Sequence, residues 1–127
     1  MLLGSSAIVA PASRSGRSPN VYDANIQTVI DLARISGFDW DAGNARKNDA
    51  HGVSATEAEQ VFFSEPLLVL EDRSHSLVEP RFHALGKTGS GRLLHITFTL
   101  RADGTKIRVI SARDMHRKER RVYEQAT

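Results

Sequence analysis

Arginine residues stand at the ends of several predicted strands of this 127-residue chain. Arg113 follows the apolar run Ile107–Ala112, Arg81 opens a strand pattern, and Arg92 stands where a turn passes into a strand. Guanidinium groups match phosphate oxygens bidentately, so strand ends gathered at one rim of a sheet would bind phosphate and stabilise transition-state charge. The alternative is a solvated arginine that keeps a sheet edge soluble. We assign function to Arg113 and Arg81, and both interpretations stay open for Arg92.

A second group of candidates lies in the charged segment Met115–Glu124, which has a helical pattern. Arg117 lies on one face of that helix, whereas Arg120 and Tyr123 fall on another line at helical spacing. The functional interpretation is that these arginines bind an anionic substrate and that Tyr123 moves protons. An amphipathic helix with solvated charges explains the same pattern, and on pattern alone it is favoured.

Histidine offers one further candidate for proton transfer, His51, which precedes Gly52 at a predicted helix end. It suits a general acid or base, and it equally suits a cation that stabilises a helix C-terminus. The chain has no cysteine, which excludes disulfides, thiolate metal sites and a cysteine nucleophile. It also lacks the glycine loops and the serine or zinc motifs of common enzymes. We therefore expect chemistry without a metal or cofactor.

Composition places the chain among ordinary globular proteins with a basic side. Hydrophobic residues make up 40% and charged residues 25%, and the length fits a single domain. The net charge is only +2, but the segment Arg113–Arg121 is densely cationic while Ala55–Glu79 is mainly acidic. That asymmetry permits a phosphate-binding surface. No stretch approaches the length of a membrane span, and we expect a cytoplasmic protein with no membrane contact.

The first 36 residues have the character of an N-terminal extension. Residues 1–20 are rich in Ser, Gly, Pro and Ala and predict a disordered lead-in. The apolar spacing in Tyr22–Ile35 predicts a helix, with Asp23 as its cap and Gly37 just beyond its end. The compact domain is expected over residues 37–127.

Within that domain the hydrophobic period changes from helical to alternating. A capping box in which Ser54 and Glu57 each bond the other's backbone opens the second helix. The glycine-rich turn Lys87–Gly91 indicates a hairpin. The predicted elements are a strand at Phe38–Asp41, helices at Ala42–Ala50 and from Ser54 to Pro66, strands at Leu67–Glu71, Arg81–Leu85, Arg92–Leu100 and Thr105–Ala112, and a helix at Met115–Glu124. This order, β-α-α-β-β-β-β-α, predicts an α+β fold with a four- to five-stranded, mainly antiparallel sheet, two N-terminal helices on one face and a C-terminal helix.

Four stretches spread in order over Phe38–Glu124 match the pattern of one known family. They are Phe38-Asp39-Trp40-Asp41 with Asn48 and His51-Gly52-Val53-Ser54; Glu57-Ala58 with Val61-Phe62; Glu71-Asp72, His75-Ser76, Glu79 and Arg81-Phe82 up to Gly86; and Ile110-Ser111-Ala112-Arg113 with Glu119-Arg120 and Tyr123-Glu124. In these residues and their order the chain resembles the BrnT family of type II toxins, which are small ribonucleases. Residues 1–36 lie outside the resemblance.

The resemblance implies a fold like that of RelE-type toxins and RNA cleavage that inhibits translation. It implies neutralisation by a BrnA-type antitoxin, with two copies of each protein in a heterotetramer that reaches DNA only through the antitoxin. It also implies a mechanism in which the RNA 2′-hydroxyl attacks the neighbouring phosphorus. Arg113 and Arg81 would hold the phosphate, and His51, Tyr123 and Glu119 are the candidates for proton transfer.

The chain departs from the family at two positions. The family commonly has a lysine where this chain has Asn44, and a basic residue where it has Ala50. If either position touches substrate, the protein is instead a weakened toxin that acts mainly as a partner-binding module. A duplex-DNA binder is a weaker interpretation, because no helix-turn-helix or ribbon signature appears.

Overall fold

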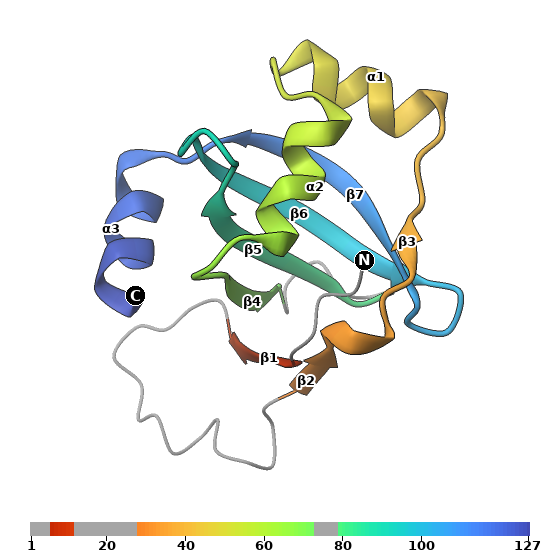
Figure 1. The fold of residues 1–127 in the computed structure, drawn as a ribbon, viewed down its shortest axis with the longest axis horizontal. Coiled ribbons are helices and arrows are strands. Elements are labelled where there is room, and N and C mark those ends of the chain that lie inside the picture. Colours follow the sequence, from red (N-terminus) through yellow and green to blue (C-terminus); the bar gives the residue numbers. More distant parts are fainter. Residues whose placement is uncertain (1–5, 12–27, 73–78) are drawn as a thin grey trace.

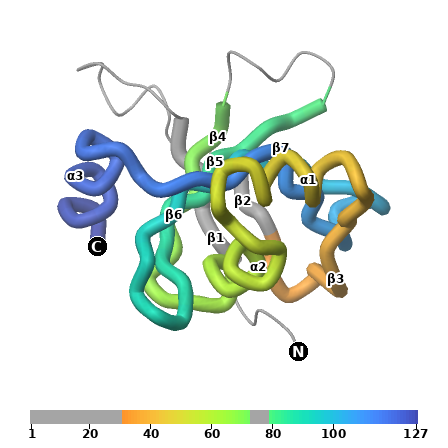
Figure 2. Tube along the Cα trace, turned by 90° about the horizontal axis from the view of Figure 1, so that it is seen from above, coloured from red at the N-terminus to blue at the C-terminus, as the bar shows by residue number. Residues whose placement is uncertain are grey.

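In the computed structural model, a sheet separates two helices on one face from a third helix on the other (Figures 1 and 2). The structure describes residues 6–11, 28–72 and 79–127, with side chains from residue 31 onward. The strands are β1 (Ser6–Pro11), β2 (Thr28–Asp31), β3 (Gly37–Phe38), β4 (Leu68–Asp72), β5 (Arg81–Lys87), β6 (Leu93–Arg101) and β7 (Lys106–Asp114). The helices are α1 (Ala42–Ala50), α2 (Ala55–Phe63), α3 (Arg117–Ala126) and the short 3-10 turn η2 (Leu32–Arg34).

The sheet is mixed but mainly antiparallel, in the order β2-β1-β4-β5-β6-β7-β3. Strands β4 to β7 form a continuous antiparallel meander, while β3 joins β7 and β1 joins β4 in parallel. The short turns after β5 and β6 dictate antiparallel neighbours, whereas β3 reaches its partner only from far along the chain. The predicted α+β class and the mainly antiparallel sheet are confirmed.

Helices α1 and α2 begin where their caps predict. Asp41 accepts hydrogen bonds from the backbone N–H groups at the start of α1, and Ser54 and Glu57 form the expected capping box on α2. The stripe formed by Ala58, Val61 and Phe62 packs on the sheet, where these residues are 0 to 2% exposed.

The packing of α2 against β5 requires a residue without a side chain at position 86. A Cβ at Gly86 would lie 2.9 Å from the Val61 side chain, so only glycine allows this close approach. The main core therefore lies between α2 and the covered face of the sheet.

The N-terminal predictions are partly wrong. Thr28–Asp31 form strand β2 and Leu32–Arg34 form a 3-10 turn, in place of the second half of the helix predicted over Tyr22–Ile35. Ser6–Pro11 form strand β1 inside the predicted disordered lead-in. Ala33, one of the residues whose spacing suggested that helix, is exposed, and the residues of this segment that enter the core are Leu32 and Ile35, which are 5% and 3% exposed. The extension over residues 1–36 stays a prediction, but its last residues contribute to the core.

Two further differences concern strands. The strand predicted over Phe38–Asp41 is reduced to Gly37–Phe38, because the chain turns away at Asp39 to start α1. The order of the whole chain differs from the predicted one by β1, β2 and η2 at its start. The predicted loop over Asp72–Pro80 falls mostly on residues 73–78, outside the described residues. Within the described part, no helix is both long and apolar enough to cross a membrane.

Candidate functional site

The sheet face opposite α2 carries a row of polar side chains on its central strands. Residues paired across neighbouring strands point to the same face, and the register aligns His83 with Thr97 and Thr97 with Ser111. The next row aligns His95 with Arg113. Helix α3 covers only one end of this face, where Tyr123 packs with Leu85 and Met115. Among the described helices, none covers the remainder of this face.

A cleft of about 490 Å³ lies on this open face beside α3. Its lining combines two imidazoles, one guanidinium, one carboxylate and two hydroxyls with two leucines. These residues are Leu70, His83, Leu85, His95, Thr97, Ser111, Arg113 and Glu119. They come from β4, β5, β6, β7 and α3, so the site exists only in the folded chain.

The last strand delivers Arg113 to the cleft, and α3 holds it there. Both terminal nitrogens of Arg113 donate to the Glu119 carboxylate over 2.8 Å, and Nη1 also donates to the backbone oxygen of Asp114. Burial raises the pKa of Glu119, but the bonds from Arg113 and from the His116 backbone N–H outweigh it and bring the pKa to about 2. The carboxylate is therefore ionised at neutral pH and fixes the plane of the guanidinium.

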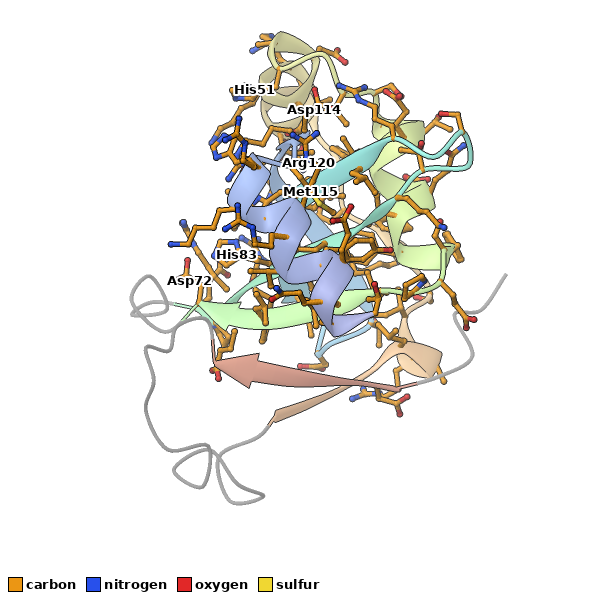
Figure 3. All side chains as sticks on the ribbon, turned by 90° about the vertical axis from the view of Figure 1, so that its left-hand side faces the viewer. His51, Asp72, His83, Asp114, Met115 and Arg120 are labelled. Atoms are coloured by element: carbon orange, nitrogen blue, oxygen red, sulfur yellow. The ribbon has the colours of Figure 1, made fainter. Side chains whose placement is uncertain are left out.

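His83 is bonded at both ring nitrogens. Its Nε2 lies 2.9 Å from the Asp72 carboxylate and its Nδ1 lies 3.0 Å from the Thr97 hydroxyl. Asp72 is only 7% exposed. Figure 3 shows Asp72 and His83 next to each other on the side of the sheet that carries α3.

His95 packs against His83 and is the more buried of the two. The ring centroids lie 4.8 Å apart, and Nε2 of His95 lies 3.8 Å from Glu119. Burial is the main reason why the pKa of His95 falls to about 4. The ring is therefore neutral at pH 7.

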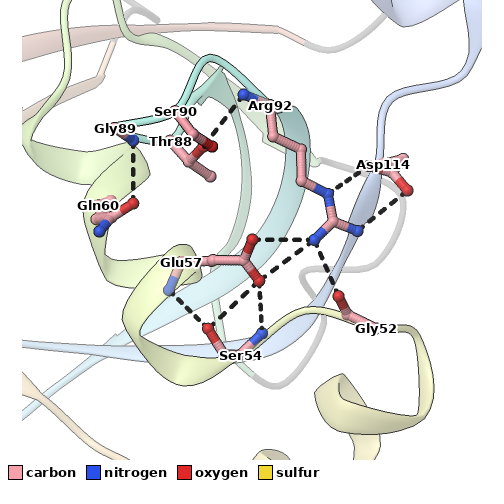
Figure 4. A network of polar contacts seen from close by, with 9 residues as sticks. All are labelled: Gly52, Ser54, Glu57, Gln60, Thr88, Gly89, Ser90, Arg92 and Asp114. Carbon is pink, nitrogen blue, oxygen red and sulfur yellow. Dashed lines mark hydrogen bonds and ion pairs between the residues drawn. The ribbon is translucent and has the colours of Figure 1, made fainter.

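Arg92 ties three parts of the molecule together (Figure 4). It bonds both oxygens of Asp114 at the end of β7, the Glu57 carboxylate of the α2 capping box, and the carbonyl oxygen of Gly52. The bonds to Asp114 and Glu57 raise the pKa of Arg92 further. The guanidinium of Arg92 therefore makes structural contacts, and these explain why an arginine stands at this turn-to-strand junction.

Two of the predicted proton-transfer residues lie outside the cleft lining. Tyr123 is 5% exposed, and its hydroxyl donates to the backbone oxygen of Pro66 over 2.7 Å. Burial raises the pKa of its phenol. His51 is an exposed residue at the C-terminal end of α1, away from His83 and Asp72 (Figure 3).

The other predicted arginines lie around the site. Arg81 pairs with Asp72 across β4 and β5 and shares a strand face with His83, two residues further on. Arg117 and Arg120 are exposed on α3, the helix that borders the cleft. Of the predicted site residues, the structure brings Arg113 and Glu119 into the cleft.

The sequence interpretation missed the histidines. His95 and Thr97 alternate with apolar residues along β6, and His83 occupies the same kind of position on β5. Period-two alternation puts these residues of each strand on one face, and two histidines on adjacent strands are the signal that would have identified them. The pairing with Asp72 depends on register, which the sequence does not fix.

Neither of the two departures from the family pattern lines the cleft. The Asn44 side chain is 7% exposed and donates to the backbone oxygens of Asp39 and Val109. It joins α1 to β7. Ala50 is exposed in the last turn of α1.

Comparison with known proteins identifies one family. The family described as "Ribonuclease toxin, BrnT, of type II toxin-antitoxin system" matches residues 40–119, which include every residue of the cleft lining. No curated protein matches the chain. Across the described residues, no group of three or more His, Asp or Glu side chains is arranged to hold a metal ion.

Proposed function

This chain belongs to the BrnT family of ribonuclease toxins of type II toxin–antitoxin systems, and we propose that it cleaves RNA in the cleft beside Arg113. The cleavage is an endonucleolytic, metal-independent attack by a 2′-hydroxyl on the adjacent phosphorus. It yields a 2′,3′-cyclic phosphate and a 5′-hydroxyl end, and it inhibits translation. The site of action is the cytoplasm.

The observation that carries this proposal is the orientation of Arg113. A guanidinium has five N–H donors. The bonds to Glu119 and to the Asp114 carbonyl use three of them, those on Nη1 and one on Nη2. The Nε–H and the second Nη2–H remain, and these lie parallel on one edge, the arrangement that a phosphate accepts bidentately.

The held guanidinium suits the transition state better than the ground state. Negative charge grows on the phosphoryl oxygens as the 2′-oxygen attacks, and a donor fixed in advance needs no reorganisation to meet it. One such donor contributes about 3 kcal/mol, or roughly 10²- to 10³-fold in rate. Arg81, at the start of β5, adds positive charge near the same face.

Substrate RNA reaches the cleft past a cationic helix. Arg117 and Arg120 are exposed on α3 and would contact phosphates outside the scissile bond. The two leucines of the cleft provide apolar surface and His83 a ring face against which an unpaired base would pack. Single-stranded RNA is therefore the expected substrate.

The partner implied by the family is an antitoxin of the BrnA type. We propose a heterotetramer with two copies of each protein, in which DNA is bound only by the antitoxin. A RelE-like arrangement of the toxin fold is part of the same proposal.

The competing function is a weakened toxin that only binds its partner. Asn44 and Ala50 suggested it, but neither lines the cleft, and Asn44 is used to anchor α1 on β7. Growth arrest on expression without an antitoxin, lost in Arg113→Ala with an unchanged circular dichroism spectrum, would exclude the binding module.

The direct test uses purified protein with excess EDTA, with and without ribosomes. We expect cleavage of a mixed-sequence RNA and no cleavage of its 2′-deoxy analogue. Cleavage of the deoxy analogue, or loss of activity on chelation, would contradict the mechanism. Arg113→Ala should slow cleavage by about 10²-fold or more.

A further inference from the structure

We propose that His83, oriented by Asp72, is the general base that takes the proton from the attacking 2′-hydroxyl. The inference rests on the ribonuclease function proposed above and assigns a role that the sequence interpretation gave to other residues. It makes His83 a catalytic residue and Asp72 a positioning residue. Three features of the geometry support it.

The first feature is the tautomer of His83. An ionised carboxylate can only accept hydrogen bonds, so the Asp72 oxygen at 2.9 Å requires the proton to be on Nε2. The opposite nitrogen, Nδ1, then carries the lone pair and acts as an acceptor. The 7% exposure of Asp72 protects this bond from competition by water.

The second feature is what lies at Nδ1. The Thr97 hydroxyl is 3.0 Å away, and both residues line the cleft. Because Nδ1 is the acceptor, Thr97 donates to it. A hydroxyl thus already occupies the position from which a 2′-hydroxyl would deliver its proton, within the reach that a general base needs. In the complex, the RNA hydroxyl replaces that of Thr97, whose side chain turns to bond the ligand.

The third feature is the weakness of the alternatives. Among the described residues, four titratable side chains line the cleft: His83, His95, Arg113 and Glu119. Burial lowers the pKa of His95 to about 4, and the paired Glu119 has a pKa of about 2, so both are weak bases. In the described structure, the Nδ1 atom of His95 is buried without a hydrogen-bond partner, so no carboxylate orients that ring from Nδ1.

The reaction step balances without a further reagent. The 2′-proton passes to Nδ1 of His83 as the bond from the 2′-oxygen to phosphorus forms, and the bond from phosphorus to the 5′-oxygen breaks. The imidazolium is stabilised by Asp72. The departing 5′-oxygen takes a proton from water in the open cleft, and the resulting hydroxide recovers the proton from His83.

The test compares His83→Ala, His83→Gln and Asp72→Asn with the unaltered protein in single-turnover cleavage of RNA. We expect both His83 variants to lose about 10²- to 10⁴-fold in rate. Asp72→Asn replaces a carboxylate, which can only accept, by an amide that can also donate, so the tautomer is no longer selected and cleavage should also be slowed at least 10²-fold. Affinity for the uncleavable 2′-deoxy analogue should change less than threefold, since the base does not hold the phosphate.

Chemical rescue separates catalysis from structure. Added imidazole should raise the cleavage rate of His83→Ala at least tenfold and leave the rate of Arg113→Ala unchanged. His116→Gln is the matched control, because it removes an exposed imidazole outside the cleft lining. Circular dichroism establishes whether each variant is folded. If His83→Ala is not folded, His83→Gln replaces it in the comparison of rates.

The outcomes distinguish this inference from the function on which it rests. A wild-type protein that cleaves RNA but not the deoxy analogue, together with His83 variants within threefold of its rate, would overturn the inference alone. A fall in rate matched by an equal fall in affinity, or no rescue by imidazole, would also overturn it. Cleavage of the deoxy analogue by the wild type would instead refute the proposed function.

Discussion

Replacing Glu119 by glutamine should weaken the docking of α3 on the sheet. The substitution keeps the shape of the side chain and removes its charge. The carboxylate receives two bonds of 2.8 Å from Arg113 and one of 2.8 Å from the His116 backbone N–H. Glutamine keeps one acceptor oxygen but places an N–H₂ donor against the guanidinium. The two bonds of the ion pair are then reduced to at most one bond from the guanidinium to a neutral amide oxygen.

The magnitude follows from the pKa of this group. A fall in the pKa of Glu119 from 4.5 to about 2 corresponds to about 3 kcal/mol if it is converted in full. The side chain is 24% exposed, and solvent screening of such a pair reduces the figure to about 1–2 kcal/mol. We expect Glu119→Gln to lose that amount of unfolding free energy at pH 7.

The sign of the pH dependence is fixed by the same shift. The pKa of Glu119 is lower in the folded than in the unfolded chain, so its contribution is complete above pH 4.5. It is lost as the pH falls from 4.5 towards 2. The difference between wild type and Glu119→Gln should therefore shrink to less than half by about pH 3.

Urea denaturation at pH 7 and pH 3, followed by circular dichroism, measures this difference. Glu124→Gln is the matched control, because Glu124 is an exposed carboxylate on the same helix. The control should stay within about 0.5 kcal/mol of wild type at both pH values. A Glu119→Gln protein as stable as the control at pH 7, or a difference that grows at pH 3, would refute the reasoning.

Three further changes test other parts of the structure. Arg92→Met removes the bonds to two carboxylates and should cost about 2 kcal/mol in a denaturant titration; a loss below about 0.5 kcal/mol would show that the network is not stabilising. Replacing Arg117 and Arg120 by glutamine should lower the slope of log affinity for single-stranded RNA against log salt by about 1.4, and an unchanged slope would place RNA elsewhere. Tyr123→Phe loses one bond to Pro66 and should cost about 1 kcal/mol with the cleavage rate within threefold; a hundredfold slower rate would restore Tyr123 as a proton donor.

The sequence predicted those elements whose signals are local. The caps at Asp41 and Ser54 set the starts of α1 and α2, and the alternation in β6 set its two faces. The helix predicted over Thr28–Arg34 was wrong, although its apolar spacing fits a helix. The segment pairs instead with β1, about 20 residues earlier in the chain, and such a pairing leaves no signal in local spacing.

Residues of the cleft were singled out from the sequence where one residue type at a strand end was enough, and missed where register was needed. Arg113 at the end of β7 was singled out in this way and lines the cleft, and its role stays a prediction. His83 has its meaning only beside Asp72 and Thr97, which lie 11 and 14 residues away on other strands. Conversely, Arg92 also stands next to a strand end in the sequence. In the structure its guanidinium is bonded to carboxylates from two other elements.

The most direct measurement is the rate and the end chemistry of RNA cleavage by wild type and Arg113→Ala, in EDTA and at one saturating protein concentration. We expect 2′,3′-cyclic phosphate and 5′-hydroxyl ends from the wild type, and a rate lower by about 10²-fold or more in a folded Arg113→Ala. Equal rates for the two proteins, or products with 3′-hydroxyl and 5′-phosphate ends, would contradict the proposed mechanism.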